Sequence, residues 1–366
     1  MIMNILLIGE YSRIHWTLAY ALRELGHKVD VLSNDNLWHS SSNYVSMINN
    51  PTNWGIIKHT FNLLKVLPQL RGYDVVQLIN PYFYEIKEEL LLYVYQYLRK
   101  NNKKIFLGGF GNDFYWVSEC MNNSSFRYSD FYVNNIYRDT IDNRMAITNW
   151  IHGYRGKLNR IIANDCNGII TGFYESYAAY NSHFPNKTTY IPYPIESITQ
   201  PQYPSPDMEK VKFYITMQRH REELKGKDEL YRALYTLQYM HPQECEITKT
   251  VCTLYDEFEH LMDGCDVMME QLYSYSPGIS ALHAMSKGIV VVGGAEEEYY
   301  NLLGEKKLRP IINVRPEGND IYEKLDDLLA NKNKIAQLST ESVSFIRKHH
   351  SPINVAKRCL EFWEQK

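Results

Sequence analysis

The 366-residue sequence lacks the features that would place it across a membrane, on nucleic acid or around a metal ion. No apolar run approaches the roughly 18 residues that a membrane-spanning helix needs. The net charge is −3, so no overall basic field attracts nucleic acid. The six cysteines form no C-x-x-C pair, and no histidine stands at zinc-ligand spacing from two of them. We therefore expect scattered reduced thiols, no metal site, no nucleic-acid partner and a cytoplasmic location.

The common nucleotide-binding motifs are also missing. The chain has no G-x-x-x-x-G-K-[ST] phosphate loop, and the turn at Gly9–Arg13 does not match G-x-G-x-x-G. A second turn, Gly109-Phe110-Gly111, lacks the third glycine. No Asp-x-Asp occurs, which argues against enzymes that hold a sugar nucleotide through a divalent ion. Tyrosine is abundant, with 30 residues; its ring and hydroxyl suit carbohydrate surfaces, although half-buried packing explains most tyrosines equally well.

The first half of the chain alternates short apolar runs with segments of helical periodicity. This pattern predicts buried strands joined by amphipathic helices. Residues from about 114 to 150 are rich in Asn, Tyr and Ser and weakly periodic, so we expect an irregular insertion there. The expected strands are 4–8, 28–32, 74–79, 104–107, 168–171 and 188–191, and the expected helices are 14–25, 56–70, 86–100 and 174–183.

Five prolines fall within residues 192–210, a density that forbids regular elements and indicates a linker. A second alternating series follows the linker. It predicts strands at 212–216, 266–269 and 289–292, and helices at 227–240, 279–287, 317–330, 332–349 and 353–364. Strand–helix alternation in both halves predicts an α/β protein with two doubly wound, Rossmann-like domains, whose ligands bind in the cleft between them.

Two segments of the second half suit a phosphate group. Arg219 and Lys225 lie between a strand and a helix, where charge-assisted hydrogen bonds could hold a diphosphate; a solvated loop balanced by Glu222 and Glu223 is the alternative. Pro277-Gly278 opens a predicted helix whose free amides face the same cleft. Any strand–turn–helix unit can begin in this way, so the second signal is weak by itself.

Together, in order and spacing, these segments resemble the retaining GT-B glycosyltransferases of family four. The resemblance rests on Arg219…Lys225-Gly226, on Gly278…Ala284-Met285-Ser286-Lys287-Gly288 with its Val-rich strand, and on looser pieces along nearly the whole chain. Those pieces are Leu25-Gly26-His27-Lys28-Val29, Ile191-Pro192-Tyr193-Pro194-Ile195, Cys265-Asp266-Val267 and the segment from His349 to Ala356.

The resemblance implies a GT-B fold with an acceptor-binding domain at 1–195, a nucleotide-sugar domain at 196–352 and a terminal helix, 353–366, that crosses back. It implies transfer of a sugar from a UDP- or GDP-linked donor to a glycan, lipid or small-molecule acceptor, with retention and without a metal. The alternatives are a binding protein of the same shape without turnover, or a nucleotide-sugar epimerase. The helix at 56–70 carries basic and apolar residues, so it is either an ordinary buried helix or a contact with a membrane surface.

The resemblance also assigns site residues. Donor binding falls to Arg219, Lys225, Gly278, Ile279, Ser280 and His283, and acceptor binding to Gly9, Tyr11, His15 and Asp113. Catalytic roles fall to Asp113, Arg219, Lys225 and Tyr275. For His15 and Asp113 the alternatives are a structural histidine and an Asn-Asp turn.

The chain departs from the family at two points. The family has two glutamates eight positions apart, where this sequence has Tyr275 and His283. His283 can still bond a ribose hydroxyl, whereas Tyr275 cannot supply a carboxylate charge. Only about 25 residues separate the helix ending near Met240 from Asp266, so we expect a trimmed second domain that lacks one strand–helix unit.

Overall fold

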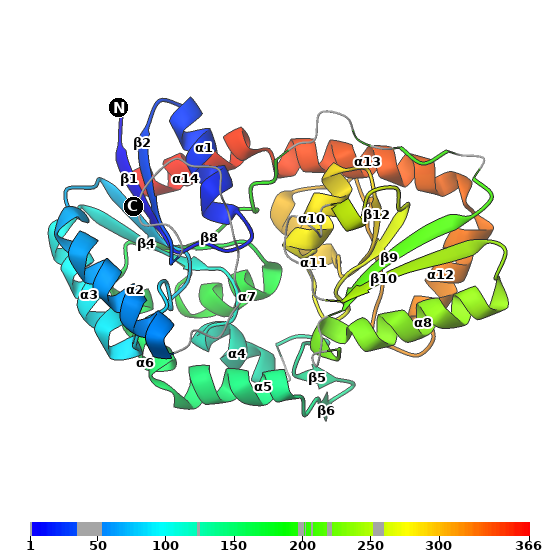
Figure 1. Cartoon of the computed structure of the whole chain (residues 1–366), viewed down its shortest axis with the longest axis horizontal. Helices are drawn as coiled ribbons and strands as arrows, with labels where there is room; N and C mark the ends of the chain where they lie inside the picture. The colour runs from blue at the N-terminus through cyan, green and yellow to red at the C-terminus, as the bar shows by residue number, and fades with distance from the viewer. Residues whose placement is uncertain are drawn as a thin grey trace.

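Two parallel sheets, each covered by helices on both faces, form the two halves of the protein in a computed structural model (Figure 1). The structure describes residues 2–34, 53–122, 125–196, 201, 203–205, 208–217, 222–251 and 260–366. The first sheet has the strand order β2-β1-β3-β4-β7-β8 and the second β10-β9-β11-β12-β13. All neighbouring strands within the two sheets run parallel. The predicted fold class is therefore confirmed.

The first sheet is buried because apolar side chains point to both of its faces. In β1, Ile5 and Leu7 pack toward α1 and α14, whereas Leu6 and Ile8 pack toward α2, α3 and α6. Its strands are β1 (Asn4–Ile8), β2 (Lys28–Leu32), β3 (Val75–Leu78), β4 (Lys104–Gly109), β7 (Gly168–Thr171) and β8 (Thr188–Tyr190). Its helices include α1 (Ile14–Glu24), α2 (Asn53–Val66), α3 (Glu88–Asn101), α6 (Tyr154–Asp165) and α7 (Tyr174–His183).

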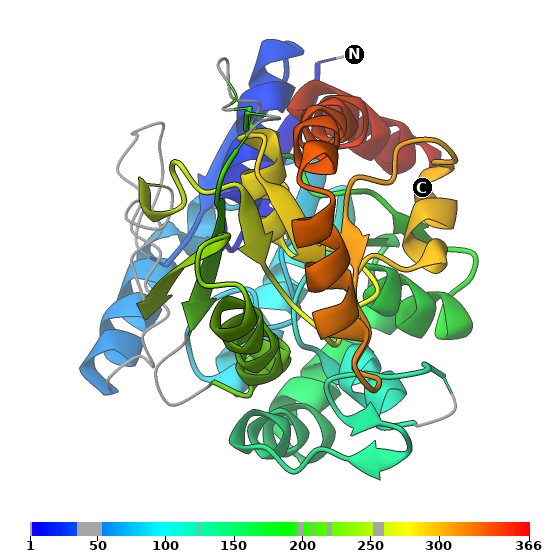
Figure 2. The ribbon, with the colours of Figure 1, turned by 90° about the vertical axis from the view of Figure 1, so that its right-hand side faces the viewer.

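The second sheet repeats this layered arrangement, as Figure 2 shows from the side of that half. In β9, Phe213 and Ile215 pack toward α8 and α12, whereas Tyr214 packs toward α10 and α13. The strands are β9 (Val211–Met217), β10 (Cys245–Val251), β11 (Val267–Met269), β12 (Val290–Gly293) and β13 (Ile312–Asn313). The helices are α8 (Lys227–Met240), α10 (Ile279–Ser286), α11 (Glu297–Leu303), α12 (Asp320–Ala330) and α13 (Asn333–His349).

The expected trimming of the second half is wrong in one respect. Strand β10 occupies the stretch that we expected to lack a strand, and it pairs with β9 along its whole length. Polar residues such as Glu246 and Lys249 hide this strand in the sequence, because β10 is an edge strand with one side toward solvent.

The segment at 114–150 is more regular than its composition suggests. It contains α4 (Phe114–Met121), a hairpin of β5 (Tyr132–Val133) and β6 (Ile136–Tyr137), and α5 (Ile141–Ala146), which continues into a π-helix at Ile147–His152. Asn134 and Asn135 both have positive φ, as a tight hairpin turn requires. Figure 1 shows this segment below the first sheet, with the hairpin reaching toward α8 of the second half.

The C-terminal helix α14 (Pro352–Gln365) returns from the second half and packs against α1. Trp363 is fully buried beside Phe106 of β4, and the Lys104 ammonium donates a 2.8 Å hydrogen bond to the Trp363 carbonyl. No helix or strand is assigned between β8 and β9 in the described part of the linker. The limits 1–195, 196–352 and 353–366 stay our predicted division of the chain.

Helix α2 is not the buried helix that we favoured. Ile57, Phe61 and Leu64 are all more than half exposed along one face, and the Lys65 ammonium lies 4.3 Å from the centre of the Phe61 ring. Across the described residues, no helix combines the length and hydrophobicity that crossing a membrane requires.

Candidate active site

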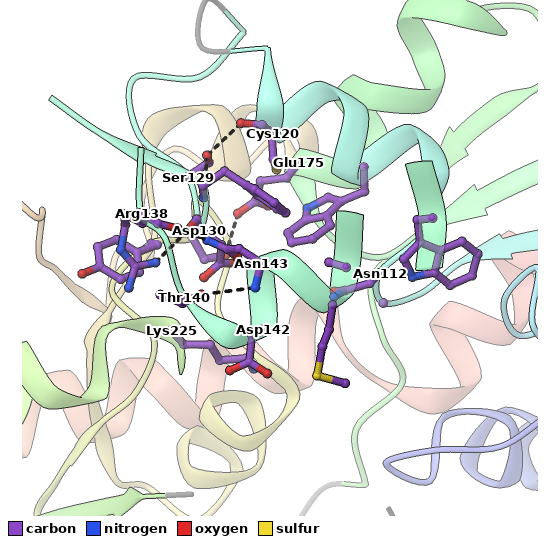
Figure 3. A pocket seen from close by; sticks show the side chains of 18 of the residues that line it. Asn112, Cys120, Ser129, Asp130, Arg138, Thr140, Asp142, Asn143, Glu175 and Lys225 are labelled. Carbon is purple, nitrogen blue, oxygen red and sulfur yellow. Dashed lines mark hydrogen bonds between the residues drawn. The ribbon is translucent and has the colours of Figure 1, made fainter. Parts of the chain in front are cut away.

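A cavity of about 370 Å³ lies between the two halves, next to the 111–155 segment (Figure 3). Its first wall comes from the loop after β4, α4, the residues on either side of the hairpin, α5, the π-helix and the start of α7. Its second wall comes from the loops before α8 and α10. This is where a doubly wound fold places ligands, because strand ends and helix starts meet at one edge of each sheet. The volume lies at the lower end of the roughly 300–1,000 Å³ range of small-molecule sites.

Two glycines bring the π-helix into place. A Cβ on Gly156 would lie 1.9 Å from the Trp150 carbonyl oxygen, and one on Gly153 would lie 2.4 Å from that of Asn149. Any other residue at these positions would push the π-helix away from α6. The close approach sets Asn149 and Trp150 into the cavity wall.

Arg138 joins the first wall to the second half. Its guanidinium donates to the Asp130 carbonyl at 2.7 Å and to the Glu223 carbonyl at 3.0 Å, and it lies 3.7 Å from the centre of the Tyr273 ring. Asn143 donates a further 2.8 Å bond to the Asp130 carbonyl. The backbone at Asp130 is therefore fixed, and its carboxylate is left beside the cavity.

Lys225 is the cation of the second wall. Its backbone is left-handed, with φ of 58°, and its carbonyl accepts a 2.8 Å bond from the Leu272 amide. Gly226 follows with φ of 71°; a Cβ there would lie 2.7 Å from that of Leu272, so only glycine fits. Within the described residues, no hydrogen bond or ion pair to the Lys225 ammonium is found. Burial raises the pKa of Asp130, and the charges of Arg138 and Lys225 oppose the rise.

Glu175, at the start of α7, ties the two halves together at the back of the cavity. Its Oε1 accepts 2.6 Å bonds from the Ser274 hydroxyl and the Tyr275 amide. Burial raises the pKa of Glu175, and these hydrogen bonds oppose the rise. Glu175 was not among the predicted site residues. A single acidic residue in a tyrosine-rich helix gives no sequence signal of a contact 99 residues away.

The predicted acceptor residues lie in or beside the first core. His15 is fully buried, with Nδ1 2.7 Å from the Gly9 carbonyl and Nε2 3.3 Å from the Gln77 amide nitrogen, and burial lowers its pKa to about 4. Gly9 has φ of +87°, and a Cβ there would lie 2.9 Å from the Phe83 carbonyl. The Tyr11 hydroxyl donates to the Phe110 carbonyl. These contacts favour structural roles.

Asp113 is also a structural residue by its contacts. It is fully buried, accepts a 2.8 Å bond from the Trp116 amide as the N-cap of α4, and accepts another from the Tyr180 hydroxyl at 2.8 Å. Burial raises its pKa to about 6, and the two hydrogen bonds oppose this rise. Its neighbour Asn112 lines the cavity instead.

Tyr275 does not point into the cavity. It is buried among Phe126, Tyr128 and Tyr174, and its hydroxyl accepts a 2.6 Å bond from the Arg127 amide. Burial raises its pKa to about 12. A packing role between the two halves fits this environment, contrary to the predicted catalytic one.

His283 and the start of α10 lie in the second half, away from the cavity lining. Burial lowers the pKa of His283 to about 4, and the charges of Arg13 and Lys287 lower it further. Gly278 is the N-cap of α10, followed by the half-buried Ile279 and Ser280. A Cβ on Gly278 would lie 3.0 Å from the Glu270 carboxylate, so a negative charge of the protein already adjoins this helix start. Arg219 lies outside the described residues.

Lys227 corrects our reading of this loop. As the first residue of the predicted helix 227–240, beside the solvent-exposed loop, Lys227 was expected on the outer face of that helix. Instead, only 8% of its surface is exposed and its ammonium donates a 2.9 Å bond to the Met269 carbonyl. Burial lowers its pKa to about 8, while the charge of Glu270 raises it.

Of the predicted site residues that the structure describes, only Lys225 lines the cavity. Among the described residues, no group of three or more His, Cys, Asp or Glu side chains could hold a metal ion.

No protein-family model matches the sequence, and a search of curated proteins finds no match. Solved structures do match. Sucrose-phosphate synthase from Thermosynechococcus elongatus aligns with a TM-score of 0.62 over 99% of this chain and 98% of that chain, at 13% identity. HepE from Anabaena, solved with UDP and glucose, aligns with a TM-score of 0.56 over 100% of both chains, at 12% identity.

The fold is that of the GT-B glycosyltransferases. TarM from S. aureus, solved with UDP, α-GlcNAc-glycerol and fondaparinux, shares this fold with a TM-score of 0.56 and 12% identity. The alignment covers 83% of this chain but only 59% of the TarM chain. All three likenesses concern the fold.

Proposed function

We propose that the protein is a glycosyltransferase that takes a nucleotide-sugar donor, UDP- or GDP-linked, into the cavity between its two halves. The observation that supports this most is Lys225, whose ammonium lines the cavity from the loop between β9 and α8. Two solved neighbours that share the fold, HepE and TarM, carry UDP.

In this proposal Lys225 meets the diphosphate. An ammonium at the edge of a low-dielectric cavity stabilises two negative phosphates, and it does so most as the sugar departs and charge grows on the leaving group. Arg219, from the same loop, stays our predicted second cation. The resemblance to family four supports retention and a reaction without metal, and we propose both on that basis.

His283 stays the residue that the resemblance to family four assigns to the ribose, and its neutral ring can donate or accept one hydrogen bond near pH 7. Because His283 lies outside the cavity lining, this contact requires the nucleoside to extend from the cavity toward α10. Tyr275, by contrast, is assigned here to packing between the halves. We therefore propose that no acidic side chain takes the role of the family's first glutamate at position 275.

Nucleotide titration of a lysine pair tests the donor site. Lys225→Ala should weaken the binding of UDP or GDP roughly 10- to 100-fold, as expected for a charge-assisted hydrogen bond to phosphate. The matched control is Lys212→Ala, an exposed lysine near the opposite end of β9. Calorimetry with both nucleotides, followed by an assay of donor consumption, measures both steps. Equal affinity of the two variants would remove Lys225 from the donor site.

We also propose that the exposed face of α2 touches a membrane surface. Ile57, Phe61 and Leu64 supply the apolar contact, and Lys58 and Lys65 supply positive charge beside it. Co-sedimentation with phosphatidylglycerol vesicles should be lost in Phe61→Asp and kept in Tyr235→Asp, which changes an exposed aromatic residue of α8. Equal sedimentation of the two variants would contradict this contact.

A further inference from the structure

The first wall of the cavity carries side chains that the donor leaves unused. Trp116, Asp130, Asn149 and Trp150 line it, and none of them belongs to the loops that we assign to the nucleotide. These residues bring apolar faces and polar groups together in one concave surface. Concave surfaces that combine apolar and polar side chains bind small molecules that also carry both apolar and polar groups.

The aromatic part of this wall is held rigidly. The Trp116 ring meets Phe131 edge to face, with centroids 6.0 Å apart, and Trp150 is 94% buried. Gly153 and Gly156 fix the π-helix that carries Trp150. π-helical turns are rare and are frequently found at functional sites. Fixed tryptophans offer flat apolar surfaces at little entropic cost, and sugar rings present flat C–H faces to them.

The cations of this wall are already bonded to the protein. Arg138 donates to two carbonyls and stacks on Tyr273, and Arg155 donates to Glu88 at 2.8 Å and stacks on Tyr82. The Asp130 carboxylate, in contrast, accepts no hydrogen bond within the described part of the chain. The wall therefore offers a hydrogen-bond acceptor to a ligand and no uncommitted cation.

We propose that this wall binds the acceptor substrate and that the acceptor is a neutral carbohydrate, whose hydroxyls donate to Asp130 while a ring face lies on Trp116. This inference rests on the proposed function and specifies its second substrate. An anionic acceptor, such as a uronate or a phosphate ester, would meet the Asp130 charge, and Lys225, the one cation of the described cavity lining that is not bonded to the protein, is assigned to the donor. Neither His15 nor Asp113, which the sequence indicated as acceptor residues, lines this cavity, and the structure buries both.

Saturation-transfer NMR with neutral and anionic disaccharides tests this inference. The probes are maltose, lactose, diacetylchitobiose and digalacturonate, each added to the full chain with UDP present. We expect transfer to at least one neutral disaccharide and none to digalacturonate. Asp130→Asn and Trp116→Ala should weaken the saccharide signal roughly fivefold or more, the effect of losing one hydrogen bond or one stacking contact.

The matched control is Asp139→Asn, which removes the same charge from the same segment at an exposed residue that pairs with Arg144. It should bind like the native chain, and melting curves should show all three variants folded. Equal signals from Asp130→Asn and Asp139→Asn would overturn the inference, as would binding of digalacturonate alone or of no saccharide. A UDP titration of the same samples separates the two proposals, since UDP binding without saccharide binding refutes only the acceptor site.

Discussion

Lys225 and Lys227 stand two positions apart and have opposite environments. The left-handed backbone at Lys225 and Gly226 turns the first lysine to the cavity and the second to the interior. Only the first is available to a ligand. The second bonds the Met269 carbonyl in a site that disfavours its charge.

Because of Lys227, the free energy of unfolding should vary with pH in the alkaline range. Its pKa is about 8 in the folded chain and 10.5 ordinarily, so the unfolded chain holds the extra proton between these values. Stability therefore rises as the pH increases from about 8 to about 10.5, and this gain is absent below pH 8, where both states carry the proton. Lys227→Met should abolish a gain of roughly 1–3 kcal/mol between pH 7.5 and pH 10, measured by urea unfolding. An unchanged slope in the variant would contradict the buried position, and Lys212→Met serves as the exposed control.

Two substitutions at Asp113 distinguish a structural role of its carboxylate from a catalytic one. Asp113→Asn keeps the N-cap bond to Trp116 and should keep donor turnover, whereas Asp113→Ala should cost roughly 1–3 kcal/mol by removing the cap and the partner of Tyr180. The folded pKa of about 6 exceeds the ordinary 3.8, so the native carboxyl is most favourable at low pH. Relative to Asp113→Asn, the native chain should lose stability as the pH rises from 4 to 7. Loss of turnover in a stable Asp113→Asn protein would restore the catalytic assignment.

Among the elements, the segment that leads into the hairpin of β5 and β6 bridges the two halves by ionic contacts. Glu296 is 1% exposed and accepts bonds from Arg127 at 2.9 Å, from Arg315 at 2.8 Å and from the Tyr128 hydroxyl at 2.8 Å. Arg127 and Tyr128 lead into the hairpin, whereas Glu296 and Arg315 belong to the second half. Burial raises the pKa of Glu296, but the bonds from Arg315, Asn313 and Tyr128 outweigh it and hold the pKa at about 2.

Removing the Glu296 charge should weaken this bridge. Glu296→Gln should cost roughly 2–4 kcal/mol at pH 7, because it leaves two arginines without their shared partner. The folded pKa lies below the ordinary 4.5, so the contribution is present above pH 4.5 and is lost as the pH falls toward 2. Urea unfolding should show a smaller gap between native chain and variant at pH 3 than at pH 7. Glu298 is the more exposed carboxylate partner of Arg127, so Glu298→Gln should lower the free energy of unfolding by less than Glu296→Gln does. A larger loss in Glu298→Gln would mean that the exposed ion pair contributes more than the buried one.

Element boundaries could be predicted where hydrophobic periodicity and a turn residue coincide. Helices α7 and α8 and strand β7 match the sequence prediction residue for residue. The 114–152 segment could not be predicted in this way, because its strands are two residues long and its packing depends on contacts with the second half. The Asn134-Asn135 turn was its one local signal. The cavity wall was missed for the same reason, whereas Lys225 followed from its place between a strand and a helix.

At the scale of the whole molecule, helix α14 follows the second half in the chain but packs into the core of the first half. Its Trp363 is fully buried, and the indole N–H has no hydrogen-bond partner among the described residues, so its contribution is packing alone. Trp363→Ala should lower the free energy of unfolding by roughly 3–5 kcal/mol, as for other buried aromatic residues. Circular dichroism during urea unfolding measures this loss, with the exposed Glu361→Ala as control. A cost below that of the control would mean that α14 does not stabilise the first half.

The chain crosses between the halves twice, and the two crossings are joined. The Ile195 amide donates a 2.9 Å bond to the His350 carbonyl, and His350 Nδ1 lies 2.9 Å from the Tyr193 carbonyl. Figure 1 shows α13 meeting α14 at the top of the molecule, while the hairpin lies at the bottom. A rotation of one half against the other about these joined crossings would move the hairpin most, because the hairpin lies at the opposite end of the molecule. Such a rotation would have to break the Arg127–Glu296 ion pair.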